Sequence, residues 1–274
     1  SAWGGRGVGY IDSECEFCRP TSSGYEWTVA QGYQLDEEEE CVRSLLDEPT
    51  YCFPGDSMVE TEDNGMIRLE DLKIGDKVNT GDSFETVYSF GHYSKTSNTE
   101  YLQLQASSGK SLTVSGMHMV FTENGAVPAE RVLVGDKLVI SNGSLEEVVG
   151  IKSVKSSGAY APFTSNGKII VNDFMASNYV SLNAESKLMG LFDMQFIAHI
   201  SQAPHRLACK WNFELWCTNE TYSPDGLSTW IRGPLHAAKL FLKQNILVQS
   251  VTFVPALALL SVFGLIEATI LFAE

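Results

Sequence analysis

Two stretches of the sequence repeat one pattern, and they restrict the fold more than any other feature. Residues 72–78 (LKIGDKV) and 132–138 (VLVGDKL) both place Gly-Asp-Lys between apolar residues, sixty positions apart. A pattern that occurs only twice does not make a solenoid, which needs three or more units to bury a continuous core. The repeat therefore predicts two similar subdomains related by a pseudo-twofold axis.

The segments around this repeat have the alternation of β-strands. Short runs of this kind occupy 101–105 (YLQLQ), 111–114 (SLTV) and 168–171 (KIIV). Gly, Asn and Asp separate these segments. Many short strands divided by such turns are typical of an all-β sandwich or barrel-like fold. We therefore predict a mainly β domain.

Residues 1–51 differ from the β domain in composition. They are rich in Gly, Ser, Glu and Asp, and they show no sustained helical or strand period. Runs of like charge such as 36–40 (DEEEE) are usually solvated, so we predict an acidic, flexible segment. Cys15 and Cys18 form a C-x-x-C pair, which leaves a disulfide, a zinc site or a redox site open.

Residues 183–274 are predicted to be a helical region. Helical patterns run over 184–202 and 234–246. The segment 246–266 contains no charged residue, and a membrane span needs about twenty apolar residues. Both a membrane segment and a buried core helix remain open for this stretch.

The net charge and the cysteines limit the classes of binding partner and the cellular compartment that we expect. A net charge of −15 argues against nucleic-acid binding, because phosphate contacts need a basic face. Asn219 begins a glycosylation acceptor pattern, and Cys209 and Cys217 are close enough in sequence to form a disulfide across a small loop. Six cysteines are compatible with an oxidising compartment. We predict a protein of the secretory pathway, extracellular or membrane-anchored.

Several blocks between residues 52 and 182 occur in the order of a known family. They are 52–57 (CFPGDS), 69–78 (LEDLKIGDKV), 112–118 (LTVSGMH), the second Gly-Asp motif, 160–164 (YAPFT) and 176–179 (ASNY). This region resembles the Hint domain, the fold shared by the autoprocessing half of hedgehog proteins, Hog-type proteins and inteins. The resemblance implies a Hint fold over 52–182, with the released segment before it and the helical region after it.

The resemblance also implies a self-cleavage reaction. Cys52 would attack the preceding carbonyl, that of Tyr51, through a five-membered ring and convert the amide into a thioester. His118 would protonate the departing nitrogen. Ser115 stands where the family has a Thr that polarises the scissile peptide, and its hydroxyl can also serve as a donor.

Three departures from the family limit what the resemblance implies. His92 falls where cholesterol-attaching hedgehog proteins have an Asp proposed to activate the sterol, although a His can also act as a base near neutral pH. Asn178 falls where hedgehog has a Cys. Inteins end in an Asn followed by Cys, Ser or Thr, whereas Asn178 precedes Tyr179. Splicing is therefore not expected, and cleavage by cyclisation of Asn178 stays a hypothesis.

Two functions from different classes follow. The first is single-turnover self-cleavage at Tyr51–Cys52, in which water, a sterol, another lipid alcohol or an amine resolves the thioester. Its substrate is the chain's own N-terminal segment, and its chemistry requires no metal or cofactor. The alternative is an inactive module of the same fold that acts as a secreted or membrane-anchored interaction protein. Replacement of the family's residues by Ser115 and His92 favours this alternative.

Overall fold

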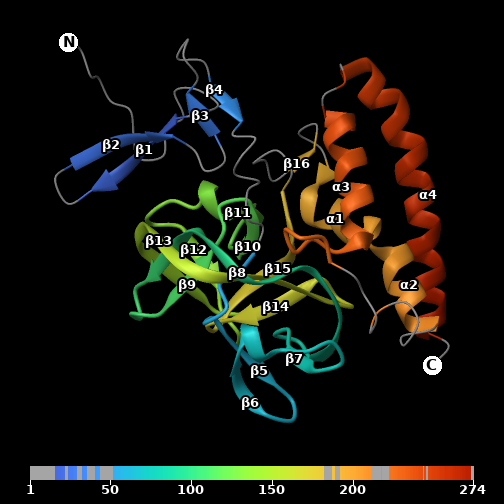
Figure 1. The fold of residues 1–274 in the computed structure, drawn as a ribbon, viewed down its shortest axis with the longest axis horizontal. Helices are drawn as coiled ribbons and strands as arrows, with labels where there is room; N and C mark the ends of the chain where they lie inside the picture. The colour runs from blue at the N-terminus through green and yellow to red at the C-terminus, as the bar shows by residue number, and fades with distance from the viewer. Residues whose placement is uncertain are drawn as a thin grey trace.

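The protein has a mainly β body followed by a helical region, as a computed structural model shows (Figure 1). The structure describes most of the chain from residue 52 onwards. Its described residues are 16–21, 24–29, 33–35, 41–43, 52–181, 187–188, 192–211, 217, 222–242, 244 and 246–272.

One antiparallel sheet of eleven strands forms the body. Its main path runs β14-β15-β10-β12-β13-β8-β7-β5-β6, with β11 paired to β10 and β9 paired to β8. The strands are β5 (Met58–Thr61), β6 (Gly65–Arg68), β7 (Lys77–Asn79), β8 (Phe84–Ala106), β9 (Ser111–Val114), β10 (His118–Thr122), β11 (Gly125–Pro128), β12 (Lys137–Val139), β13 (Leu145–Thr164), β14 (Lys168–Val171) and β15 (Phe174–Val180).

The two copies of the Gly-Asp-Lys repeat adopt the same local structure. In the first copy, the Asp76 carboxylate accepts the backbone N–H of Lys73 at 2.9 Å. In the second, the Asp136 carboxylate accepts that of Leu133 at 2.8 Å. A short 3-10 helix precedes each turn, η1 (Leu69–Asp71) and η2 (Ala129–Arg131). These matched contacts agree with the predicted pseudo-twofold relation.

Matching bonds also attach each copy to a long strand. Gly75 donates to the carbonyl of Val87 in β8, and Gly135 donates to that of Val148 in β13, both at 2.8 Å. The two long strands then pair with one another along most of their length. The core lies beneath this pairing, where side chains such as Leu104 and Tyr160 are fully buried.

The long strands differ from the many short ones that the sequence predicts. β8 has 23 residues and β13 has 20. Their register shifts at several points, including the steps Ser157/Ala159 and Ala161/Pro162. Such irregularities bend and twist a strand, so one continuous strand follows the curved body where the sequence pattern suggests separate segments.

The N-terminal segment contains strands that its sequence pattern does not predict. β1 (Glu16–Thr21) pairs with β2 (Gly24–Val29), and β3 (Tyr33–Leu35) pairs with β4 (Cys41–Arg43). Aromatic and β-branched residues favour strands even where alternation is weak, and β2 reads GYEWTV. Cys18 lies in β1 opposite Trp27, whereas Cys15 lies outside the described residues.

The C-terminal region is helical, with different boundaries from those predicted. Its helices are α1 (Met194–Ser201), α2 (Ala203–Trp211), α3 (Thr229–Leu242) and α4 (Ile246–Phe272). The predicted helix over 184–202 begins only at Met194, after the short strands β16 (Lys187–Leu188) and β17 (Phe192–Asp193). The side chain of Asp193 accepts the N–H of Phe196, and this cap fixes the start of the helix.

Buried polar contacts join the helices to the sheet. The Arg206 guanidinium in α2 makes two hydrogen bonds to the Glu267 carboxylate in α4, at 2.6 and 2.7 Å. It also donates to the carbonyl of His199 and to the hydroxyl of Tyr179 in β15. Arg206 thus links two helices to the strand next to β10.

The segment 246–266 lies within α4. Phe253 of this helix is buried and contacts Phe241 of α3. Among the described residues, no helix combines the length and the apolar character needed to cross a membrane.

Candidate active site

Backbone pairing places Cys52 at the edge of β13. Phe53, the next residue, exchanges two hydrogen bonds with Tyr160, of 2.9 and 3.0 Å. This antiparallel bridge puts Cys52 in register with Ala161. Cys52 is fully buried, and it clusters with Ala159 and Ala161.

His92 lies in β8, which pairs with the opposite edge of β13. It pairs with Ala161 in the register of β8 and β13, and paired side chains point to the same face of a sheet. Ala161 has only a methyl group, so the flanking side chains can meet above it. The Cys52 Sγ lies 2.9 Å from the His92 Nδ1.

The second ring nitrogen of His92 determines which tautomer is present. Nε2 lies 2.6 Å from the backbone carbonyl of Asp225. A carbonyl can only accept a hydrogen bond, so Nε2 must carry a proton and donate it. Burial lowers the pKa of His92, and the contact and charge of Asp225 oppose that shift only in part. The ring is therefore neutral at pH 7, and Nδ1 accepts the thiol proton of Cys52.

Ser115 makes hydrogen bonds to both the N–H and the carbonyl of Cys52. The N–H of Cys52, which belongs to the peptide bond after Tyr51, donates to the Ser115 Oγ at 2.9 Å. The N–H of Ser115 donates to the Cys52 carbonyl at 3.0 Å. The resemblance predicts that this hydroxyl is a donor, whereas in the structure its oxygen accepts the N–H of Cys52. These two contacts fix the peptide nitrogen that would depart in a cleavage reaction.

His118 belongs to the same turn as Ser115. Its backbone N–H donates to the Ser115 carbonyl at 3.1 Å, so a tight turn connects the two residues. The His118 ring is fully buried and packs on the Phe53 ring, with 4.3 Å between centroids. Its Nε2 donates to the carbonyl of Ser177 at 2.7 Å.

Asn178 makes its contacts within the closing strands. Its side-chain amide bonds the hydroxyl of Thr164 at 2.8 Å, and its backbone N–H donates to Gly167. These bonds tie β15 to the end of β13, and they give Asn178 a structural role in this state. Tyr51 and Asn219 lie outside the described residues.

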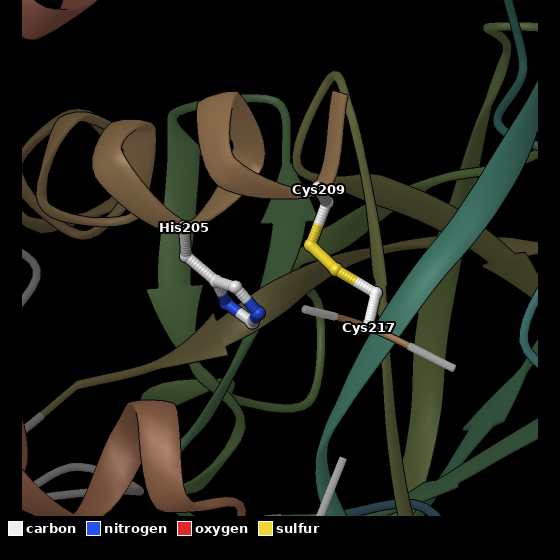
Figure 2. A group of neighbouring side chains, drawn as sticks. All are labelled: His205, Cys209 and Cys217. Carbon is white, nitrogen blue, oxygen red and sulfur yellow. A yellow bond between two sulfur atoms is a disulfide. The ribbon is translucent and has the colours of Figure 1, made fainter. Parts of the chain in front are cut away.

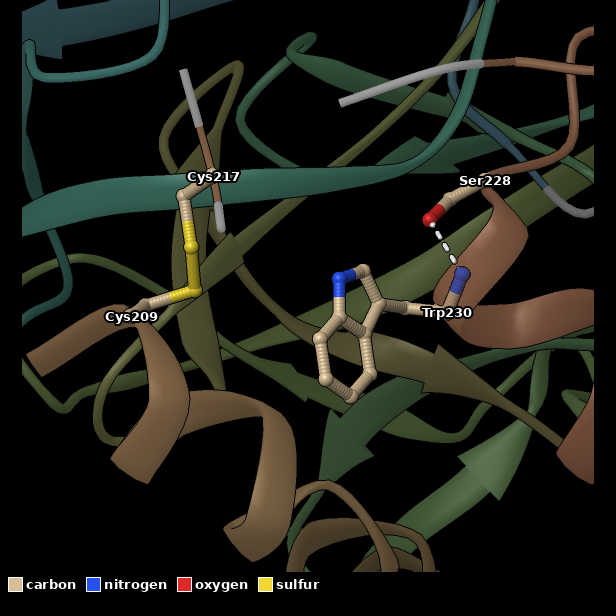
Figure 3. Close-up of a disulfide and its surroundings, with 4 residues drawn as sticks. All are labelled: Cys209, Cys217, Ser228 and Trp230. Atoms are coloured by element: carbon tan, nitrogen blue, oxygen red, sulfur yellow. Dashed lines mark hydrogen bonds between the residues drawn. A yellow bond between two sulfur atoms is a disulfide. The ribbon is translucent and has the colours of Figure 1, made fainter. Parts of the chain in front are cut away.

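A second cluster of polar side chains lies among the helices. The ligand atoms of His205, Cys209 and Cys217 lie within 4.8 Å of one another, and Figure 2 shows the imidazole beside the two sulfurs. A metal would need deprotonated thiols, but Cys209 and Cys217 form a disulfide with Cα atoms 5.7 Å apart. The ring of Trp230 stacks on that of His205, and Figure 3 places this tryptophan near the disulfide. The cluster is a structural junction in the oxidised protein.

Residues 39–232, more than half of the chain, match the model of the Hint module. The chain belongs to the Hint family.

Hint-containing relatives include nematode and vertebrate proteins. Warthog protein 6 of Caenorhabditis elegans is 32% identical over 158 residues, which cover 52% of this chain and 26% of that protein. Sonic hedgehog protein of Danio rerio is 27% identical over 175 residues, which cover 57% of this chain and 40% of that protein. The chain thus spans less than half of the length of either relative.

Solved structures that match part of this chain include an intein and an intein-like domain. The gp41-1 intein is 20% identical, with a TM-score of 0.42 over 46% of this chain and 97% of that one. An intein-like domain from Clostridium thermocellum is 25% identical, with a TM-score of 0.41 over the same shares of the two chains.

The site contains one contact that sequence reasoning misses. Asp225 takes part through its backbone carbonyl, which every residue type possesses, and it lies 133 positions from His92. The family match ends at residue 232, beyond the boundary at 182 drawn from the motifs. The extension of the family match past residue 182 is the sequence signal that could have placed this segment with the Hint module.

Proposed function

We propose that this Hint protein cleaves its own chain between Tyr51 and Cys52 through a thioester. The observation that carries this proposal is the contact of the Cys52 thiol with the neutral imidazole of His92. A thiolate, and not a thiol, is the nucleophile. The His92 Nδ1 is oriented to take the thiol proton at the moment of attack.

In the first step, the Cys52 sulfur attacks the carbonyl carbon of Tyr51. The S–H proton passes to His92, a C–S bond forms, and the C–N bond to Cys52 breaks. Attack within one residue needs no diffusing partner, which removes a large entropic part of the barrier. The N-terminal segment is then held as a thioester.

The departing nitrogen must gain a proton, and His118 is the proposed donor. Because Nε2 of His118 already donates to the Ser177 carbonyl, Nδ1 carries a proton only in the imidazolium form, and this form gives that proton to the nitrogen and becomes neutral. Ser115 holds the nitrogen through its N–H bond. After the step, that nitrogen is the α-amine of Cys52.

In the second step, an external nucleophile attacks the thioester. Water gives a free carboxylate at Tyr51, whereas a sterol, another lipid alcohol or an amine gives a modified product. The Cys209–Cys217 disulfide supports a site of action in the oxidising secretory pathway.

Hydroxylamine tests this function, because it cleaves thioesters and leaves ordinary peptide bonds intact. The purified full chain is incubated with and without hydroxylamine at pH 7 and followed on a gel. We expect two fragments from the wild type and an intact Cys52→Ala chain. An intact wild-type chain under both conditions would instead support an inactive Hint module.

A further inference from the structure

We propose that the turn from Ser223 to Leu227 is a positioning element of the active site, whose Asp225 carbonyl directs the Nδ1 of His92 at Cys52. This inference rests on the self-cleavage proposed above. It adds that the reaction depends on a segment of the C-terminal region, on the far side of β8 from β13.

The turn lies along β8 as a short added strand. Leu227 forms an antiparallel bridge with His92. On one side, the N–H of Tyr93 donates to the Gly226 carbonyl at 2.9 Å, and on the other the N–H of Ser228 donates to the Gly91 carbonyl at 3.1 Å. Because these backbone bonds flank His92, the position of the Asp225 carbonyl relative to the ring is fixed.

The turn is closed by its own hydrogen bonds. Ser223 N–H donates to the Leu227 carbonyl at 2.9 Å, and Gly226 N–H donates to the Ser223 carbonyl at 2.8 Å. The Ser223 hydroxyl lies 3.1 Å from the N–H of Leu227. Such closure holds the carbonyl of Asp225 outward, toward β8.

Gly226 allows the turn to approach the ring. Its φ is +88°, and a Cβ there would lie 2.7 Å from the His92 Cδ2 and 2.9 Å from the Tyr93 carbonyl oxygen. Any side chain at this position would push the turn and the imidazole apart. Gly109 has almost the same φ, +86°, with no atom within 4 Å of its Cβ position. It therefore supplies a matched control.

The helices hold the turn in place. Ser228 leads directly into α3, where its hydroxyl accepts the N–H of Trp230 at 3.1 Å. Trp230 stacks on His205 of α2, with 4.6 Å between ring centroids. The Cys209–Cys217 disulfide lies beside this stack (Figure 3). The helical region thus acts on the Cys52 thiol through one backbone carbonyl, that of Asp225, which contacts the His92 ring.

The consequence concerns the proton of His92. With Nε2–H bound to a carbonyl, the lone pair of the neutral ring is on Nδ1, toward Cys52. If the turn withdraws, the ring can adopt either tautomer and water can reach it. The titratable groups that face His92 are the Cys52 thiol and the Asp225 carboxylate, and the charge of Arg232 acts on that carboxylate.

The test compares Gly226→Ala with Gly109→Ala in the full chain, with hydroxylamine cleavage followed from pH 4.5 to 8.5. For Gly226→Ala we expect a rate about 100-fold lower at pH 7, as for a misplaced catalytic group. The acid limb of its pH profile, where the rate declines at low pH, should also move to higher pH, toward the pKa of a solvated histidine near 6.5. Gly109→Ala should keep the wild-type rate and profile. An unchanged rate or an unmoved acid limb in Gly226→Ala would overturn the proposal, as would equal losses in both variants.

A second readout does not depend on cleavage. Long-range proton–nitrogen NMR of the uncut Cys52→Ala chain reports the tautomer of His92. We expect the Nε2–H form, and a mixture after Gly226→Ala is added. A mixture already present without that substitution would overturn the proposal. If the wild type never cleaves, the proposed function fails while this measurement still decides the role of the turn.

Discussion

The β body and the C-terminal region contribute to the site in different ways. The body supplies side chains: the Cys52 thiol meets the His92 imidazole through the register of β8 and β13, and the Ser115 hydroxyl accepts the N–H of Cys52. The C-terminal region supplies a backbone carbonyl, that of Asp225. The side chains of the site thus lie among the motif blocks of residues 52–182, whereas Asp225 lies beyond these blocks, within the longer family match that ends at residue 232.

The largest effect is expected from a substitution in the β body. His92→Ala removes the base, and general-base groups contribute roughly 10²–10⁴-fold to a rate. We expect thioester formation to slow by at least about 100-fold. The loss of the wild-type rate in acid should occur only below pH 6.5, because burial lowers the pKa of His92. Stopped hydroxylamine assays between pH 4.5 and 8.5 measure both.

His236→Ala provides the control for this prediction. His236 is exposed on α3, so its loss should leave the rate and the pH profile unchanged. A His92→Ala chain that cleaves at the wild-type rate would show that another group takes the thiol proton.

A substitution in the ion pair between α2 and α4 should have an intermediate effect. Glu267→Gln leaves the Arg206 charge buried without its partner, with side-chain exposures of 4% and 14% for the pair. Breaking such a pair costs about 3–5 kcal/mol. Hydrogen exchange of α2 and α4 should accelerate accordingly, while exchange in β8 and β13 should change little.

The double variant Arg206→Met/Glu267→Leu separates charge from packing. It should recover much of the lost protection, because it removes both buried charges. Equal exchange in the wild type and in Glu267→Gln would show that the ion pair does not hold the helices.

The smallest expected effect is a gain in stability. His205 is buried, and neither ring nitrogen has a hydrogen-bond partner among the described residues. His205→Phe keeps a ring against Trp230 and removes these unpaired groups, so we expect a gain of about 1 kcal/mol in urea unfolding of the Cys52→Ala chain.

The gain from His205→Phe should grow in acid. Burial and the charge of Arg206 lower the pKa of His205 to about 4, whereas the unfolded chain titrates near 6.5. The unfolded state therefore binds more protons between these values, and the native histidine loses stability as the pH falls from 6.5 to 4. Unfolding at pH 7 and pH 5 measures the difference, and a loss of stability in the variant would mean that the ring nitrogens are satisfied.

Much of the body could be predicted from the sequence because its signals are local. Each Gly-Asp-Lys turn closes within four residues through its own aspartate, so the motif carries its structure with it. The long bent strands escaped prediction, since bulges interrupt the alternation that marks a strand. The N-terminal hairpins escaped it because their segment shows no sustained alternation. Cys52, Ser115 and His118 were identified by the order of the family blocks, whereas the roles of these residues stay predictions.

His92 and Asp225 show where sequence reasoning ends. His92 was noticed as a departure from an expected Asp, but its distance from the Cys52 sulfur follows from the register of β8 and β13 and from the small size of Ala161. The contact of Asp225 depends on how the C-terminal region packs on β8. No pattern of residue types encodes a backbone carbonyl brought in from so far along the chain.

The most direct measurement is the intact mass of the fragments formed by the full chain in dithiothreitol, beside Cys52→Ala. We predict a break between Tyr51 and Cys52, with residues 1–51 ending in a dithiothreitol thioester or, after its hydrolysis, a free carboxylate. The Cys52→Ala chain should keep its full mass. An uncut wild-type chain, or a break at another peptide bond, would contradict this prediction.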